Sequence, residues 1–202
     1  MTKSFDPQHL HRTLERLPPF NRVAFAASCC ERLLPNYAAF AAAAHWGHPS
    51  ILRDALDFVW ASLEKGHGDP EHVERLIKRC ETVIPHTDDF SLKYTSAAVD
   101  AGTAVIETLQ SVLDGVSQHV VDVATFCRDT VDMFIQERDG LKLSDPDFET
   151  KIAHDPLMLQ ELSRQADTLA ELSGIPNMNQ FFLKRLREEC RAEGISNIGL
   201  SA

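Results

Sequence analysis

Long hydrophobic runs are missing from this 202-residue sequence. Its most apolar stretch, residues 37–46, has about half the length that a helix needs to cross a bilayer. Residues 1–6 contain an acid and lack the apolar core that an export signal requires. We therefore expect a cytoplasmic protein that has no membrane partner.

Cysteine spacings typical of disulfides or metal sites are missing as well. The cysteines are odd in number and include no Cys-x-x-Cys pair, which argues against a disulfide framework. Neighbouring helix residues point about 100° apart, so Cys29 and Cys30 cannot both face one metal ion or pair with each other. We interpret the cysteines as small buried hydrophobic side chains in a reducing compartment. They are Cys29, Cys30, Cys80, Cys127 and Cys190.

The short motifs of the common enzyme classes are also absent. The sequence has no GxSxG nucleophile turn, no GxxxxGK[ST] or GxGxxG phosphate loop and no HExxH zinc motif. His45 and His48 flank a turn that breaks helical register, and no third metal ligand lies near them in the sequence. We predict no catalytic residue, no cofactor and no metal.

Positive charge is scarce. The chain has 30 acidic and 20 basic side chains, which give a formal net charge of −10. Such a field repels a phosphate backbone, so we predict no nucleic-acid partner.

Helical periodicity is present from end to end. Apolar residues recur at helical spacing, and proline and glycine stand where the periodic segments begin and end. We predict an all-α protein, a single compact bundle of roughly eight helices that forms one domain over residues 1–202. We expect Pro35 to break or kink the chain between two segments. Helical segments are expected at about 6–17, 21–34, 36–45, 49–65, 69–84, 96–113, 117–140, 156–172 and 178–193, with one or two further turns in the acidic link 145–154.

Five segments resemble one known family. In chain order they are 30–40 (CERLLPNYAAF), 56–60 (LDFVW), 84–90 (IPHTDDF), 98–101 (AVDA) and 193–199 (EGISNIG). They resemble the signature segments of the bacterial YjaG-like family, domain of unknown function 416, in the same order. The resemblance implies an all-helical bacterial protein without an established activity. It also implies a link to histidine-kinase signalling, which is an association and not chemistry.

A set of polar residues interrupts the apolar stripes, and we take its members as candidates for a ligand pocket. A buried carboxylate or guanidinium usually needs a partner. Structural ion pairs are therefore one interpretation, with Arg22, Arg32 or Arg53 as partners for the acids and the Tyr37 hydroxyl tied to a buried carboxylate. A polar pocket is the other, if the side chains converge on one concave site. The candidates are Glu31, Arg32, Tyr37, Asp57 and Asp100.

Basic residues recur on the last predicted helix. Lys184, Arg187 and Arg191 stand at i, i+3 and i+7 and share one face. The face is either a solvated surface or a docking stripe for an acidic protein partner. We favour a non-catalytic protein-interaction module, linked to histidine-kinase signalling by the resemblance, and an alanine-rich helix would also suit a homodimer. The alternative is a small-ligand-binding or enzymatic pocket protein that uses Glu31, Tyr37, Asp57 and Asp100.

Overall fold

The computed structural model describes residues 5–175, 177–191 and 194–201. In these residues it contains nine α-helices, a short 3₁₀ turn and no strand beyond one isolated bridge between Ile195 and Ser201. The prediction of an all-α protein is therefore confirmed. The helices are α1 (Pro7–Leu14), α2 (Pro19–Ala44), α3 (Pro49–Lys65), α4 (Pro70–Glu81), α5 (Thr95–Asp114), α6 (Ser117–Asp139), α7 (Phe148–Ala153), α8 (Pro156–Ser173) and α9 (Gln180–Arg191), with η1 at Thr87–Asp89.

Local signals explain where most helices begin and end. Helices α1, α2, α3, α4 and α8 each begin with proline, whose missing N–H costs nothing in a first turn. Just before three of these helices, Asp6, Asp69 and Asp155 accept hydrogen bonds from backbone N–H groups of the first turn. Gly66 and Gly115 end α3 and α5 with positive φ angles of 75° and 68°.

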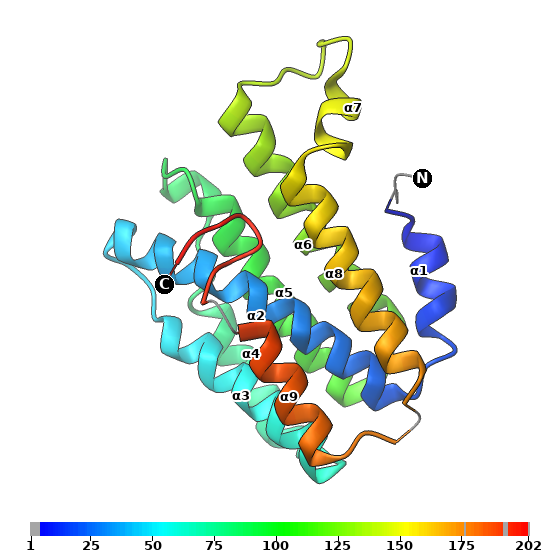
Figure 1. The fold of residues 1–202 in the computed structure, drawn as a ribbon. Helices are drawn as coiled ribbons and strands as arrows, with labels where there is room; N and C mark the ends of the chain where they lie inside the picture. Colours follow the sequence, from blue (N-terminus) through cyan, green and yellow to red (C-terminus); the bar gives the residue numbers. More distant parts are fainter. Residues whose placement is uncertain (1–4, 176, 192–193, 202) are drawn as a thin grey trace.

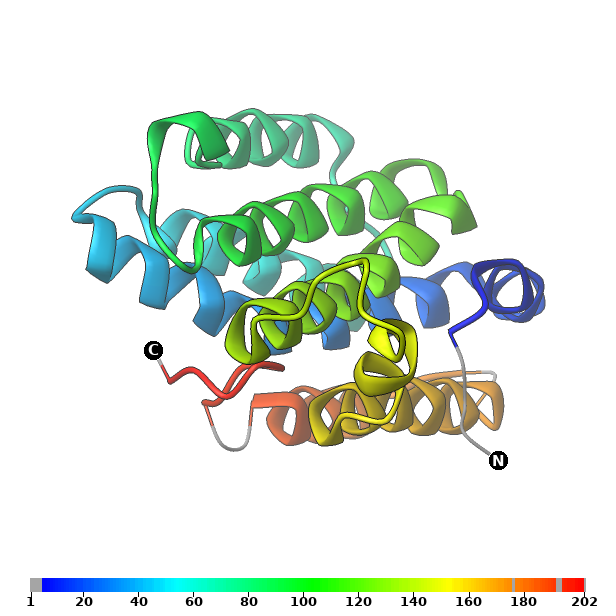
Figure 2. The same cartoon turned by 90° about the horizontal axis from the view of Figure 1, so that it is seen from above.

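Helix α2 lies at the centre of the molecule. It contacts α3, α5, α6, α8 and α9, and Figure 2 shows α8 and α9 together on one side of the molecule, with α4 on the opposite side. Its small residues, such as Ala24, Ala26 and Ala27, are fully buried and let neighbouring helices approach closely. Most faces of α2 are therefore packed, so polar residues on it must find partners inside the protein.

The apolar interior consists of a large cluster and a small one. The large cluster is built around α2, α3, α4, α5 and the first half of α6. The small cluster joins the start of α5 and the end of α6 to α7, α8 and Ile198 of the C-terminal segment, toward the end where α7 lies in Figure 1. None of the described helices is both long and apolar enough to cross a membrane.

The expected break at Pro35 does not occur. Helix α2 continues through the proline from Pro19 to Ala44, so a separate helix over 36–45 was a wrong prediction. A proline inside a helix leaves backbone carbonyls without partners. Here the N–H of Asn197 reaches the carbonyl of Arg32 at 3.1 Å, and the side chains of Asn36 and Asn197 hydrogen-bond at 3.0 Å. The carbonyl that loses its helical donor at Pro35 is that of Glu31. The C-terminal segment, 161 positions along the chain from Asn36, adds hydrogen bonds at the adjoining residues Arg32 and Asn36.

Candidate functional site

A buried glutamate, Glu31, gathers basic side chains from two other helices. Its side chain is only 1% exposed. The carboxylate accepts hydrogen bonds from Arg53 at 2.6 and 2.9 Å and from the indole Nε1 of Trp60 at 2.9 Å. The Nε atoms of Arg187 and Arg191 each lie 3.5 Å from it. Burial of this charge is tolerable because it is so fully paired.

Asp57 is the second acid of the group. It lies 2.8 Å from Nε of Arg53 and also pairs with Arg187. Three guanidinium groups therefore face two carboxylates, and one positive charge has no acidic counterpart among the described residues. We call this group the Glu31 cluster. Its members are Glu31, Arg53, Asp57, Trp60, Arg187 and Arg191.

Regular helix spacing builds the cluster. Arg53, Asp57 and Trp60 stand at i, i+4 and i+7 on α3, so all three project from one face. Arg187 and Arg191 stand at i and i+4 on α9, and the guanidinium carbon of Arg187 lies 5.9 Å from the centre of the Trp60 ring. The cluster thus ties the last helix to the centre of the fold.

The arginines keep some donor capacity. Burial disfavours the charge of Arg53, but Glu31 and Asp57 outweigh it and raise the pKa of that guanidinium above its ordinary value. The Nε–H groups of Arg53 and Arg187 form ion pairs in this cluster but no well-directed hydrogen bond with any described residue.

A cavity of about 370 Å³ opens beside the Glu31 cluster. Its charged walls are Glu31, Arg53 and Arg191, and the hydroxyl of Ser50 belongs to the first turn of α3. The remaining walls are largely apolar. We call this cavity the Glu31 pocket, and its lining residues are Glu31, Leu34, Pro35, Tyr37, Ala38, Pro49, Ser50, Arg53, Cys190, Arg191, Gly194 and Ile195.

Tyr37 lines the Glu31 pocket, but its hydroxyl has a different partner from the one expected. It donates to the backbone carbonyl of Val83 at 2.6 Å and to no carboxylate. The expectation of a tyrosine–carboxylate pair was wrong, because the loop after α4 places a carbonyl nearer to the hydroxyl than any acid. Burial raises the pKa of the Tyr37 hydroxyl, so it stays protonated at neutral pH.

Arg32 points away from Glu31. Its guanidinium forms a bidentate pair with Glu161 of α8, at 2.8 and 3.1 Å, in which both side chains are almost fully buried. It also donates to the backbone carbonyl of Ser28 at 3.0 Å. Adjacent residues on α2 thus serve two separate polar groups, and Arg32 does not line the Glu31 pocket.

Asp100 lies elsewhere, between α5 and α6. The hydroxyl of Thr130 donates to its carboxylate at 2.7 Å. Burial, with a smaller contribution from the negative charge of Asp129, raises the pKa of Asp100 to about 6. The candidate pocket residues therefore divide: Glu31, Asp57 and Tyr37 come together around one site, whereas Arg32 and Asp100 do not join them.

The raised pKa of Asp100 predicts a pH effect on stability. A carboxyl whose pKa is raised by folding stabilises the fold below its unfolded value of 3.8, and that contribution is lost as pH rises through about 6. We expect Asp100→Asn to be more stable than the wild type by about 2 kcal/mol at pH 7, with little difference at pH 4. Urea unfolding of both proteins at the two pH values measures this stability difference. A stability difference that does not change with pH would contradict a raised pKa of Asp100.

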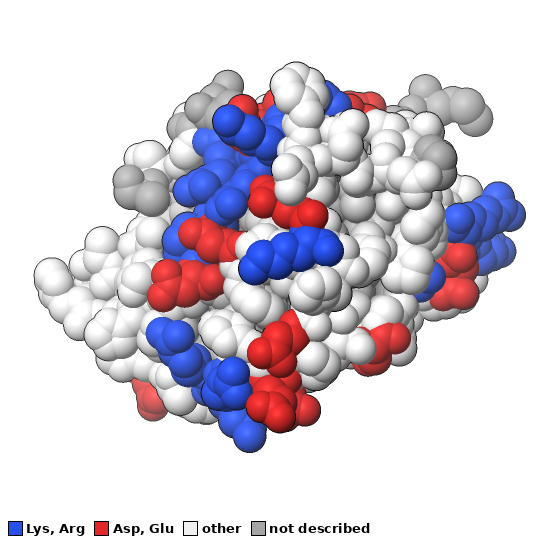
Figure 3. Space-filling model, turned by 90° about the horizontal axis from the view of Figure 1, so that it is seen from below, with Lys and Arg blue, Asp and Glu red and all other residues white. Residues whose placement is uncertain are grey.

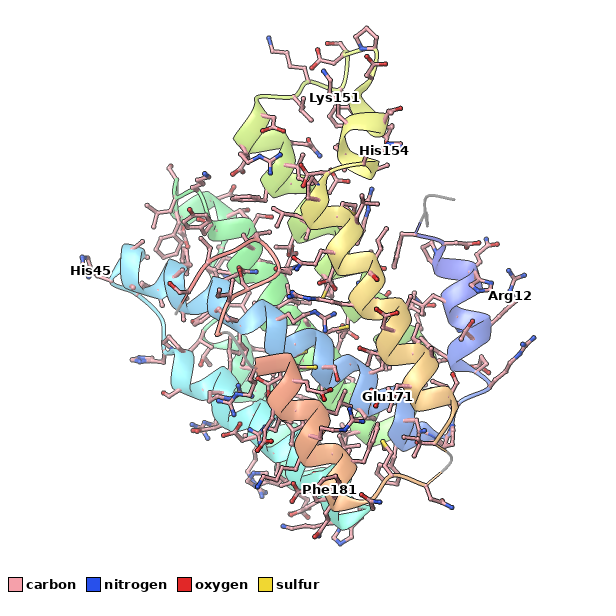
Figure 4. All side chains as sticks on the ribbon, in the orientation of Figure 1. Arg12, His45, Lys151, His154, Glu171 and Phe181 are labelled. Atoms are coloured by element: carbon pink, nitrogen blue, oxygen red, sulfur yellow. The ribbon has the colours of Figure 1, made fainter. Side chains whose placement is uncertain are left out.

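The predicted docking stripe on α9 is not a continuous free surface. Lys184 is 73% exposed and lies 3.9 Å from Glu188, whereas Arg187 and Arg191 turn toward Glu31. Figure 4 shows the start of α9, marked by Phe181, at the edge of the molecule. On the face in Figure 3, acidic side chains lie beside the basic ones. Docking of an acidic partner on this helix stays a prediction.

Sequence reasoning overlooked two residues of these polar groups. Trp60 was taken only as part of a family segment, and Glu161 was not singled out. The i, i+7 spacing of Arg53 and Trp60 carries a signal that they share a face. Nothing in the local sequence connects Glu161 with Arg32, which lies 129 positions away.

Comparison with known proteins places the chain in a family. A family model described as "Protein of unknown function (DUF416)" matches residues 9–201. The chain is 31% identical over 193 residues to the uncharacterized protein YjaG of Salmonella typhimurium, covering 95% of this chain and 96% of that protein. It is 32% identical over 192 residues to the uncharacterized protein YjaG of Escherichia coli, covering 95% of each chain.

A solved structure agrees with the family match. The crystal structure of a DUF416 family protein from Shewanella baltica superposes with a TM-score of 0.86 at 26% sequence identity, and the match covers 99% of this chain and 100% of that one. The resemblance drawn from the five sequence segments is confirmed. The chain belongs to the DUF416 family of proteins of unknown function.

Proposed function

We propose that this chain binds a small molecule in the Glu31 pocket, one that joins an anionic group to an apolar body. The observation that carries the proposal is the positive charge of three guanidinium groups that the carboxylates of the described residues do not balance, beside a cavity with largely apolar walls. Small-molecule sites typically combine an apolar lining with a few convergent polar groups, and about 370 Å³ lies at the lower end of their size range.

The chemistry of the pocket favours an anion over other polar groups. Guanidinium groups bind carboxylates and phosphates through paired N–H donors, and Arg191 is still 47% exposed at the pocket wall. The first turn of α3, which contains Ser50, has no side-chain cap and adds the positive end of a helix dipole.

Thermal unfolding with three probes tests the proposal. Phenyl phosphate and benzoate combine an anion with an apolar ring, and benzylamine carries a similar ring with the opposite charge. A ligand that binds only the folded state raises the melting temperature with its concentration. We expect both anions to raise it and benzylamine to leave it unchanged. Equal responses to all three probes, or no response to either anion, would overturn the proposal.

A pair of variants on α9 locates the binding. Arg191→Gln removes a charge from the pocket wall, and Lys184→Gln removes the same charge from an exposed position outside it. We expect Arg191→Gln to abolish most of the shift caused by phenyl phosphate and Lys184→Gln to keep it. If both variants respond alike, the anion acts through overall charge and the Glu31 pocket is not the site.

A further inference from the structure

A second polar group lies around Arg32, and it includes two buried thiols. The sulfur atoms of Cys29 on α2 and Cys127 on α6 and a carboxylate oxygen of Glu161 on α8 all lie within 4.8 Å of one another. The thiol of Cys127 also lies 3.8 Å from the backbone carbonyl of Cys29. These contacts bring together two thiols that are 98 positions apart in the chain.

The charges around the two sulfurs differ. Nη2 of Arg32 donates to the sulfur of Cys29 at 3.5 Å. The neighbouring thiol of Cys127, together with the charge of Arg32, holds the pKa of Cys29 below its ordinary value, although burial opposes them. Burial raises the pKa of Cys127 well above its ordinary value. Cys29 therefore has the character of a nucleophile and Cys127 that of a proton donor.

A metal ion fits this group poorly. Both carboxylate oxygens of Glu161 accept hydrogen bonds from Arg32, and one also accepts from Gln165 at 3.0 Å. A cation would have to displace a guanidinium that is already fixed by a bidentate pair. The two sulfurs need no such displacement to react with each other.

An oxidant of the size of water can come close to this group. Arg32 lines a cavity of about 290 Å³ on the surface between α8 and α9, and Glu171, labelled in Figure 4, lies in the same wall. The guanidinium of Arg32 is thus in contact both with this cavity and with the sulfur of Cys29, and the thiol of Cys190 lies in the same cavity wall. Hydrogen peroxide is small enough to pass with a side-chain movement.

We propose that Cys29 and Cys127 form a reversible disulfide between α2 and α6 when hydrogen peroxide oxidises the protein. The thiolate of Cys29 attacks one peroxide oxygen, which breaks the O–O bond, gives a sulfenic acid and releases hydroxide. The thiol of Cys127 gives its proton to that hydroxide and attacks the sulfenic sulfur, which forms the S–S bond and expels a second hydroxide. With the proton that Cys29 lost on ionisation, two thiols and one peroxide give one disulfide and two waters.

The neighbouring Cys30 provides an internal control. It faces α5, where its sulfur lies 3.2 Å from the hydroxyl of Thr108, and burial raises its pKa far above the ordinary value. It has the same burial as Cys29 but no contact with a guanidinium. Selective reaction of Cys29 would therefore reflect its surroundings and not a general opening of the core.

Peroxide treatment of the full chain followed by mass spectrometry tests the proposal. We expect a mass loss of about 2 Da, the two hydrogen atoms of one disulfide, which maps to a peptide pair joining Cys29 and Cys127 and is reversed by a thiol reductant. Cys30→Ala should keep this disulfide and Cys127→Ala should lose it. A disulfide that joins Cys29 to Cys190 instead, or no disulfide before Cys30 reacts, would overturn the proposal.

A variant that should form the disulfide faster distinguishes an electrostatic effect on Cys29 from a loosening of the core. The charge of Glu161 raises the pKa of Cys29, so Glu161→Gln should increase the thiolate fraction and speed disulfide formation several-fold. The reaction of Cys30 in the same sample reports any loosening of the core. A rate that falls, or one that rises equally for Cys29 and Cys30, would contradict the role assigned to this electrostatic environment.

Discussion

Replacing Glu31 with glutamine is expected to destabilise the fold by about 3–5 kcal/mol. The variant keeps the size of the side chain and its acceptor for Trp60 but removes the charge that faces the arginines. Arg53, Arg187 and Arg191 would then repel one another around a buried neutral group, with only Asp57 to balance them. The three arginines that remain are 24–47% exposed, so water screens part of their repulsion and the loss lies toward the lower end of this range.

Urea unfolding measures this loss of unfolding free energy, and two further variants serve as controls. Glu71→Gln removes a glutamate that pairs with Arg75 at 3.7 Å on the open surface of α4, and it should change stability by less than about 1 kcal/mol. Adding Arg191→Gln to Glu31→Gln should restore part of the loss, because it removes one of the repelling cations. Equal effects of Glu31→Gln and Glu71→Gln would show that the Glu31 cluster does not hold α9 on the fold.

Arg32→Met is expected to cost about as much, on the order of 3–5 kcal/mol. Methionine keeps much of the apolar volume of the arginine stem but leaves the Glu161 carboxylate, which is 1% exposed, with Gln165 as its remaining donor. The loss therefore measures an uncompensated buried acid and not a missing hydrophobic contact.

The double variant Arg32→Met with Glu161→Met distinguishes the two causes. Well-packed apolar residues often replace a buried ion pair at little cost. We expect urea unfolding to show that the double variant recovers most of the stability that Arg32→Met loses. A double variant as unstable as the sum of both single changes would mean that packing, and not charge, explains the loss.

The local elements of the fold could be predicted, because their signals lie within a few residues. The prediction of a helix over 49–65 matches α3, which begins at a proline and ends at Gly66. The failure at Pro35 has a tertiary cause. A proline is a break signal by local rules, whereas α2 continues through it where several helices pack around it and Asn197, from the far end of the chain, hydrogen-bonds to the adjoining turn.

The site was predictable only in its parts. The spacing of Arg187 and Arg191 correctly put them on one face of a helix. Asp57 stands out as an acid in or beside an apolar stripe, and Glu31 as an acid next to Pro35 that could form a buried ion pair. The pairing of acids with arginines depends on how α9 packs against α2 and α3. Asp57 and Arg187, for example, are 130 positions apart in the chain. Helical periodicity contains no information about the position of α9 on the fold, so the sequence offers the arginines only solvent or an unidentified partner.

The two indole N–H signals of the protein report on whether an anion binds beside Glu31. Trp60 donates to Glu31 inside the cluster, whereas Trp46 packs against Phe40 and Phe90 and does not line the Glu31 pocket. In ¹H–¹⁵N spectra recorded during a titration with phenyl phosphate, we expect the Trp60 signal to move to saturation while the Trp46 signal stays in place. A Trp60 signal that does not move, or two signals that move alike, would contradict an anion site at Glu31.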